Sequence, residues 1–348
     1  MKPKQFLLTL LLLSFLAACK YRTAPEQAGS SDTIPQSEIS LGGVLAEKTN
    51  GLMPLDSANS ARQPIAIEGI LNLQEKVGQM VQQRDPTISD SLLGEWETMR
   101  GDVALNFENL ADADLQKWTE LNDSLLKYTG LVCFADELEK VFFNSQSPGV
   151  VTEDAVKSVS YTRRYDRIYV NIYNNSTLDF EHTTGGKIRL IQDTSYPNDG
   201  RITFRVEIED TRYMDLYVRI PEWSKISAVT VKGVKYPVHP GQYTEIAKKW
   251  KNGDEVEVIL GLRPEVVENE QGQFAFTYGP LFLTYIKDST LVSGFADTDP
   301  IKYLQFVSPP GKMPTFTFSG IIDHTLVLQP FYAEKENGTS RTVWIPKQ

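Results

Sequence analysis

The chain has 348 residues, of which 41% are hydrophobic and 23% are charged. This composition is close to that of an average globular protein, so it excludes a chain that is mostly disordered or mostly coiled coil. The formal net charge of −10 disfavours a nucleic-acid partner, because the phosphate backbone would be repelled. Two cysteines and three histidines are too few for a disulfide framework or a Cys₂His₂ zinc site, and we expect no metal site and no cofactor.

The N-terminus has the pattern of a bacterial lipoprotein signal. Lys2 and Lys4 precede an apolar stretch over residues 6–16, which is too short to span a bilayer. The Leu-Ala-Ala-Cys that follows resembles the lipobox of bacterial lipoproteins and ends at Cys19. We predict a signal peptide over residues 1–18 and lipid attachment at Cys19, which places the protein on a membrane of the cell envelope, periplasmic or surface-exposed. The alternative is an ordinary cleavage site beside a free thiol.

Residues 19–66 are rich in Ser, Ala, Gly, Pro and Gln and show no sustained hydrophobic period. This pattern predicts a flexible tether between the lipid and the folded part. If Cys19 is acylated, Cys133 is the only remaining thiol and no intramolecular disulfide forms. A lone cysteine among apolar residues usually packs as a small hydrophobe, so a catalytic role for Cys133 is not favoured.

The segment 67–157 has helical periodicity. One apolar stripe comprises Leu115, Trp118, Leu121, Leu125 and Tyr128, and a second follows Thr129-Gly130 with Phe134, Leu138, Val141 and Phe142. These stripes predict two packed helices joined by a tight glycine turn. Upstream, Leu73, Val77 and Met80 indicate another helix, and Ser89 is a candidate start for one more.

After about Tyr161 the hydrophobic period changes to two. Ile202, Phe204 and Val206 alternate with polar residues, and turn signals such as Asn252-Gly253 separate similar runs. We expect a β-sandwich domain over residues 158–264 and a second sandwich-like domain over 265–348. The predicted fold class is therefore mostly β, with tandem antiparallel β-sandwich domains preceded by a short α-helical segment.

Many short motifs in the β region occur in the order found in one enzyme family. They include Tyr169-Val170-Asn171-Ile172-Tyr173, Ser195-Tyr196-Pro197-Asn198-Asp199-Gly200, Arg219-Ile220-Pro221-Glu222-Trp223, Trp250-Lys251-Asn252-Gly253-Asp254, Tyr278-Gly279-Pro280-Leu281 and Gln329-Pro330-Phe331-Tyr332. With them, the sequence from about residue 165 to 348 resembles the β-L-arabinofuranosidases of glycoside hydrolase family 127. The resemblance implies the β-sandwich domains that follow a catalytic (α/α)₆ barrel. We expect most of these motifs to determine the fold rather than to contact sugar.

The resemblance also implies a catalytic apparatus that this sequence lacks. Residues 128–144 resemble a late barrel helix, after which the family carries a paired cysteine that supplies the nucleophile and zinc ligands. The interval from Ser145 to Tyr165 contains no cysteine. Twelve helices with short loops need on the order of 200 residues, more than 67–157 can hold. The barrel is therefore expected to be only a remnant.

Carboxylate pairs are the alternative source of hydrolytic chemistry, since many glycosidases use two carboxyl groups. The sequence offers Glu95/Glu97, Asp112/Asp114 and Asp136/Glu139. Asp112 and Asp114 lie near a helix start and are favoured as N-terminal caps or as partners of the helix dipole. Among the aromatic residues, Tyr173 and Tyr196 are candidates to lie exposed and stack on a sugar ring, whereas His182, His239 and His324 are expected at the surface. The sequence identifies no catalytic residue.

These features predict a lipoprotein that resembles the C-terminal domains of a β-L-arabinofuranosidase and is non-catalytic. It would bind arabinose-containing or related glycans, or act as a partner subunit through the helical segment, with its N-terminal lipid in the membrane. The alternatives are an active glycoside hydrolase that uses a carboxylate pair, and a truncated remnant without selected activity.

Overall fold

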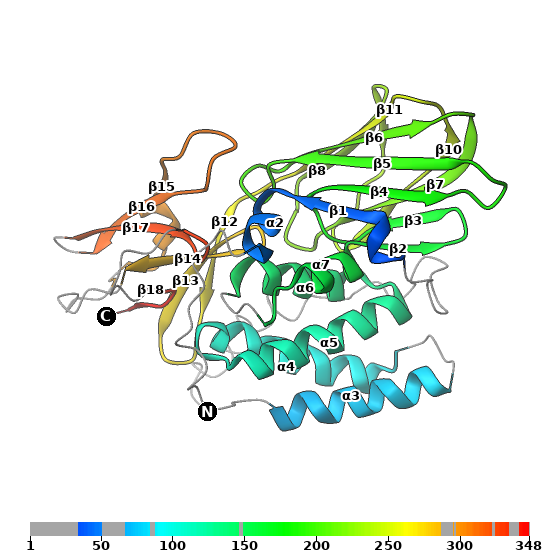
Figure 1. The fold of residues 1–348 in the computed structure, drawn as a ribbon. Helices are drawn as coiled ribbons and strands as arrows, with labels where there is room; N and C mark the ends of the chain where they lie inside the picture. Colours follow the sequence, from blue (N-terminus) through cyan, green and yellow to red (C-terminus); the bar gives the residue numbers. More distant parts are fainter. Residues whose placement is uncertain are drawn as a thin grey trace.

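A computed structural model describes residues 34–50, 67–83, 88–145, 149–286, 295, 297–321, 324–333 and 341–347. A layer of helices lies beneath two β units, a sandwich and a C-terminal sheet (Figure 1). The described helices are η1 (Gln36–Glu38), α2 (Gly43–Thr49), α3 (Ile67–Gln82), α4 (Asp90–Asn106), η3 (Phe107–Asn109), α5 (Asp112–Thr129), α6 (Val132–Asn144), α7 (Glu153–Ser160) and η4 (Pro300–Tyr303).

The helices begin and end where the local sequence indicates. The Ser89 side chain accepts a hydrogen bond from the backbone N–H of Leu92 and caps α4. Helix α5 ends at Gly130, which has a φ of 68° in the left-handed region that glycine adopts without strain. The α5 stripe is buried from Leu115 to Tyr128. The predicted pair of packed helices and the two upstream helices are confirmed.

The sandwich consists of a seven-stranded and a four-stranded sheet, in the orders β1-β4-β5-β6-β11-β8-β9 and β10-β7-β3-β2. Its strands are β1 (Ile39–Gly42), β2 (Tyr161–Arg164), β3 (Arg167–Val170), β4 (Asn175–Glu181), β5 (Lys187–Thr194), β6 (Arg201–Ile208), β7 (Arg212–Ile220), β8 (Ser227–Val231), β9 (Val234–Tyr236), β10 (Gln242–Trp250) and β11 (Asp254–Leu260). All pairs in these sheets are antiparallel except β3 with β7, which is parallel.

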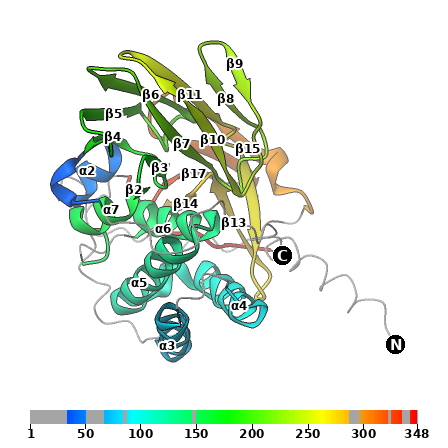
Figure 2. The same cartoon turned by 90° about the vertical axis from the view of Figure 1, so that its right-hand side faces the viewer.

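The C-terminal unit is one sheet in the order β12-β13-β14-β17-β16-β15, with β18 on β14 and β19 on β13. Its strands are β12 (Pro264–Glu268), β13 (Gln273–Tyr278), β14 (Leu281–Ile286), β15 (Leu304–Phe306), β16 (Phe316–Ile321), β17 (His324–Pro330), β18 (Arg341–Thr342) and β19 (Ile345–Pro346). An aromatic core that includes Phe274, Phe276, Phe295 and Phe318 stabilises it. The predicted mostly-β class with antiparallel sheets and a short helical segment is confirmed, with the helices packed against both β units (Figure 2).

The predicted tether over residues 19–66 is wrong for residues 34–50. Strand β1 pairs with β4, and Ile39 and Leu45 are buried in the main core. The Lys48 ammonium donates hydrogen bonds to the carbonyls of Phe142 (2.8 Å) and Phe143 (3.0 Å) at the end of α6. A cation at a helix C-terminus is favourable. This segment is therefore part of the fold, although its composition is typical of a linker.

The turn between β10 and β11 contains Asn252 and Gly253, the turn signal noted in the sequence. Gly253 has a φ of 77°, as the Asn-Gly sequence predicts, but Asn252 is not in the positive-φ region. Instead, the Asn252 side chain accepts a hydrogen bond from the backbone N–H of Ile208 (3.2 Å). The asparagine thus fixes the turn to the neighbouring strand β6.

Within the described residues, no helix is both long and apolar enough to cross a membrane.

Candidate functional site at the helix–sandwich junction

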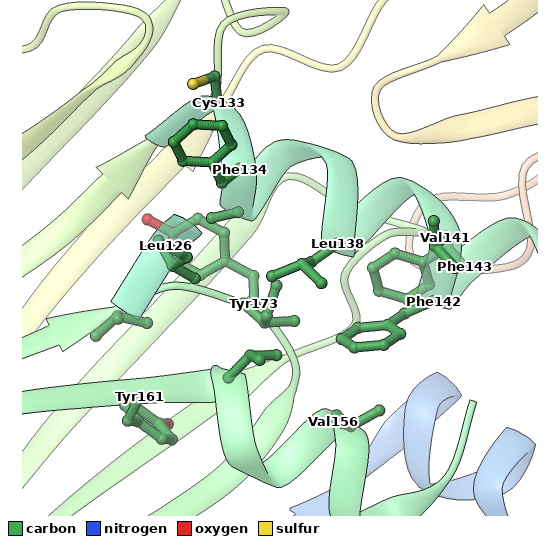
Figure 3. Packing of buried hydrophobic residues seen from close by; sticks show 14 of the residues in the cluster. Leu126, Cys133, Phe134, Leu138, Val141, Phe142, Phe143, Val156, Tyr161 and Tyr173 are labelled. Atoms are coloured by element: carbon green, nitrogen blue, oxygen red, sulfur yellow. The ribbon is translucent and has the colours of Figure 1, made fainter. Parts of the chain in front are cut away.

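Helix α6 lies between the lower helices and the sheets, and every residue of it except Lys140 is buried. Figure 3 shows its apolar side chains, among them Leu138 and Phe142, close to Tyr173 of the sandwich. The same helix buries the carboxyl groups of Asp136 and Glu139. Buried carboxylates need partners, because an isolated charge is costly away from water. The junction is therefore a candidate functional site.

Arg219 of β7 supplies that partner. Its side chain is fully buried, and its two terminal nitrogens donate to Asp136 Oδ1 and Glu139 Oε1. The second Asp136 oxygen accepts the backbone N–H of Glu222 (2.9 Å). The second Glu139 oxygen accepts the hydroxyl of Tyr196 (2.8 Å). All four carboxylate oxygens therefore already have a hydrogen-bond donor from the protein.

The charges of this group perturb one another. Burial raises the pKa of Glu139 to about 7, although Arg219 opposes the shift. Burial also raises the pKa of Asp136, again against Arg219. Burial disfavours the charge on Arg219, but Glu139 and Asp136 outweigh it and raise its pKa. A perturbed carboxyl group of this kind is often a sign of an active site, but a structural ion-pair network produces the same shift.

A second group of ion pairs extends the junction toward the surface. Arg100 of α4 donates to Glu137 (2.8 Å) and lies 3.3 Å from Glu222. Lys140 binds the same Glu137 oxygen at 2.6 Å. The pKa of Glu137 is lowered because Lys140 and Arg100 outweigh the effect of burial. The two groups together tie α4 and α6 to the end of β7.

The geometry indicates a structural role for the pair Asp136/Glu139. The two residues are 6% and 0% exposed, and a glycosidase carboxylate must reach its substrate and a water molecule. Their oxygens are also occupied by Arg219, Tyr196 and the Glu222 backbone. This pair therefore has no access to a sugar in this conformation.

The other two carboxylate pairs are not assembled into a site either. Glu95 is exposed on α4 and pairs with Lys76, whereas Glu97 is only two residues away and so points in a different direction around the helix. Asp112 and Asp114 lie in the first turn of α5, where the helix dipole stabilises a negative charge. Neither caps the helix, because the N-cap residue is Ala111 and has no side-chain cap bond. The predicted dipole role fits these positions and the predicted capping role does not.

Two predictions about aromatic and histidine side chains are wrong. Tyr173 and Tyr196 are 0% and 2% exposed, because helix α6 covers this side of the sandwich, so neither can stack on a sugar. His182 is buried, and its ring nitrogens bond Thr184 (2.9 Å) and the Tyr213 carbonyl (2.9 Å). The other two histidines, His239 and His324, are exposed as expected.

The cysteines are also placed differently from expectation. Cys133 is 2% exposed at the start of α6, and it is disulfide-bonded. The expectation of a lone thiol at Cys133 is therefore wrong for this structure, and no thiolate is available there. Cys19, the predicted lipid-attachment residue, lies outside the described residues. Helix α7 fills the interval where the resemblance would place a paired cysteine, and no cluster of three or more His, Cys, Asp or Glu residues suited to a metal occurs in the described parts of the chain.

Comparison with known families agrees with the motifs of the sandwich. Residues 167–262, from β3 to just beyond β11, match the family model described as β-L-arabinofuranosidase, GH127 middle domain. The match covers this segment, which is less than half of the chain. No curated protein sequence gives a significant match to the chain.

Solved structures share the fold of this segment and of the elements around it. A GH127 β-arabinofuranosidase superposes with a TM-score of 0.58 at 21% identity, over 68% of this chain and 49% of its own. The GH127 β-L-arabinofuranosidase Ara127N from Geobacillus stearothermophilus T6 gives 0.56 at 18% identity, over 68% and 49%. A further glycoside hydrolase gives 0.56 at 19%, over 67% and 51%. The chain thus spans about half the length of these structures, and at such identities the likeness concerns the fold.

The sequence did not single out Arg219 and Lys48, two buried basic residues that bond to α6 at the junction. A signal for Arg219 was present, since Asp136 and Glu139 lie three positions apart among the apolar residues of this helix. Two acids on a buried stripe require a cation from another element. The sequence does not indicate which of the 35 Lys and Arg residues supplies it.

Proposed function

We propose that this protein is a non-catalytic member of the GH127 fold group that binds arabinose-containing glycans at the bacterial cell envelope. The observation that carries the proposal is the closed junction, where Asp136 and Glu139 are buried and bonded to Arg219. The absence of cysteine between Ser145 and Tyr165 supports it, because the resemblance places the nucleophile there. The sugar class comes from the β-L-arabinofuranosidase names of the family model and the structural relatives.

The activity is tested with the full chain purified in detergent micelles. We expect no release of arabinose from a chromogenic β-L-arabinofuranoside above a heat-denatured control, together with saturable binding to arabinose-rich oligosaccharides in calorimetry. Turnover that persists in Cys133→Ser and disappears in Glu139→Gln would instead establish a carboxylate-dependent hydrolase. Binding to no glycan at all would refute the binding role.

We propose further that Cys19 carries a lipid. The charged start, the apolar stretch of residues 6–16 and the Leu-Ala-Ala-Cys sequence support this. A thioether at Cys19 would use the sulfur of that residue, so a lipid-bearing Cys19 could not also take part in a disulfide. We expect palmitate incorporation in cells that is lost in Cys19→Ser and kept in Cys133→Ser. An unmodified N-terminal peptide released only by a reducing agent would contradict lipid attachment.

A further inference from the structure

A polar pocket lies where the helical layer meets the C-terminal sheet, away from the junction at Arg219. Its volume is about 370 Å³, near the lower end of the roughly 300–1,000 Å³ typical of small-ligand sites. One wall is the end of α4 with η3, and another is the hairpin between β12 and β13. The third side comes from β18, β19 and the residues between them. Three segments that are distant in sequence thus build a single concavity.

Carboxamide side chains dominate the polar lining. Asn106 and Asn109 lie on the helical wall, and Asn269, Gln271 and Gln273 lie on the hairpin. Each carboxamide offers both donors and an acceptor. Sugar hydroxyl groups likewise donate and accept, so opposed amides suit a polyhydroxylated ligand. Tyr285 and Trp344 add aromatic lining, against which the apolar face of a sugar ring can pack.

Much of this hydrogen-bonding capacity is not used within the described part of the chain. The side chains of Asn109 and Gln271 make no hydrogen bond there, and Asn106 uses only its nitrogen, to the Asp102 carbonyl (2.9 Å). Gln273 uses its side-chain oxygen, which accepts from Asn269 (2.8 Å). Donors and acceptors from both walls therefore remain for a ligand.

The walls themselves are held in place by the protein. The Asn269 oxygen accepts the backbone N–H groups of Gln271 (3.1 Å) and Gln273 (2.9 Å), which fixes the hairpin. Glu108 of η3 accepts the hydroxyl of Thr342 (3.0 Å) and the backbone N–H of Val343 (2.9 Å). These bonds join the helical wall to the C-terminal strands. A preformed pocket loses less entropy on binding than one that must be ordered by the ligand.

The charges around the pocket favour a neutral ligand. No Lys, Arg or His is among the residues that line it, and Glu108 is. Two more acids neighbour the lining: Asp102, whose carbonyl accepts from Asn106, and Glu270, which lies between Asn269 and Gln271 in sequence. Burial and the charge of Glu270 raise the pKa of Asp102. A phosphate or a uronic acid would meet negative charge there, and none of the described lining residues supplies a cation to bind it.

We propose that this pocket binds a neutral sugar unit through the amides of the η3 wall and the β12–β13 hairpin. The proposal rests on the glycan-binding function proposed above and locates it. The pocket lies outside residues 167–262, the segment that matches the GH127 middle domain. Binding there requires the helical wall, the hairpin and the C-terminal strands together.

The test measures the affinity of the full chain for L-arabinose, short arabinose oligosaccharides and D-galactose, with D-glucuronate and inorganic phosphate as charged probes. The variants are Asn109→Ala with Gln271→Ala, and Asn109→Trp to fill the pocket; both positions are exposed, so folding should be retained. Gln116→Ala, an exposed amide on α5, is the matched control. Far-ultraviolet circular dichroism and urea midpoints verify that each variant is folded.

We expect a neutral sugar to bind the wild type and the control equally, and to bind both pocket variants at least about 10-fold more weakly, which corresponds to 1.4 kcal/mol. A neutral sugar that binds all four proteins equally would overturn the pocket proposal and leave the glycan-binding function standing. Tighter binding of glucuronate or phosphate that the pocket variants abolish would overturn the ligand class. No binding of any neutral sugar to the wild type would refute both proposals.

Discussion

Removal of the Arg219 guanidinium is the most direct perturbation of the junction. In Arg219→Met, a side chain of similar length keeps part of the packing against Tyr173, whose ring centre lies 5.3 Å from the guanidinium carbon. Asp136 and Glu139 then remain buried without their cation. Loss of one partner from a buried ion pair costs about 3–5 kcal/mol. We expect a loss of this size at pH 8.

Arg189→Met is the matched control, because it removes the same type of side chain from a surface pair. Arg189 and Asp179 are each 51% exposed, and their pair is made between neighbouring strands β5 and β4. Exposed ion pairs contribute little to stability. The assay is urea unfolding followed by far-ultraviolet circular dichroism and by fluorescence of the buried residues Trp96 and Trp250.

The pH dependence separates an electrostatic effect from a packing effect. The pKa of Glu139 is raised by burial to about 7 in the folded chain, above its ordinary value of 4.5. The folded state therefore binds more protons than the unfolded state between these values, so the contribution of Glu139 to stability falls as the pH rises through 7. Without Arg219 the charged form is disfavoured further, and the deficit of Arg219→Met should be larger at pH 8 than at pH 5.5. Glu139→Gln in that background should recover part of it. Equal deficits at both pH values, or a deficit no larger than that of Arg189→Met, would refute the reasoning.

Four other substitutions test the fold. Burial lowers the pKa of Lys48 from 10.5 to about 7. Between these pH values the unfolded state binds more protons than the folded state, so the stability of the protein should rise with pH. In Lys48→Met, the urea midpoint should depend less on pH between pH 7 and pH 10. A Cβ at Gly200 would lie 2.0 Å from the Leu260 carbonyl oxygen, whereas one at Gly78 of α3 would meet nothing within 4 Å. Gly200→Ala should therefore destabilise the fold by about 1–3 kcal/mol. Gly78→Ala should stabilise it by up to about 1 kcal/mol. A Gly200→Ala protein at least as stable as the wild type would contradict the clash. Asn144 donates a hydrogen bond to the Pro280 carbonyl and accepts one from the Phe282 N–H, both at 2.7 Å. Asn144→Ala should therefore lower the free energy of unfolding by roughly 1–3 kcal/mol for each group left unsatisfied. An unchanged urea midpoint would show that these bonds are not needed.

The sequence alone determined those features that depend on neighbours along the chain. The stripe from Leu115 to Tyr128, the left-handed Gly130 and the Ser89 cap define helices because each acts within one or two turns. The alternation in β6, with Ile202, Phe204 and Val206 buried, defines a strand in the same local way. Motifs in this region were sufficient to indicate the GH127 resemblance, which the family model confirms.

Only the tertiary structure decided which face of a strand is covered and by what. Alternation places Tyr217 and Arg219 on the opposite face from Val218 and Ile220, and that pattern alone would leave Arg219 in solvent. Helix α6 packs on this face and buries Arg219 between Asp136 and Glu139. The same helix buries the tyrosines that the sequence left open for sugar stacking.

The N-terminal segment and the pocket follow the same rule. Strand β1 is held by its pairing with β4, about 140 positions later in the chain, and a polar composition does not reveal such a partner. The pocket needs η3, the β12–β13 hairpin and the last strands at once. Local propensity sets the conformation of a short segment, whereas burial and charge pairing depend on contacts between distant segments. These contacts closed the carboxylate pair and formed the proposed sugar site.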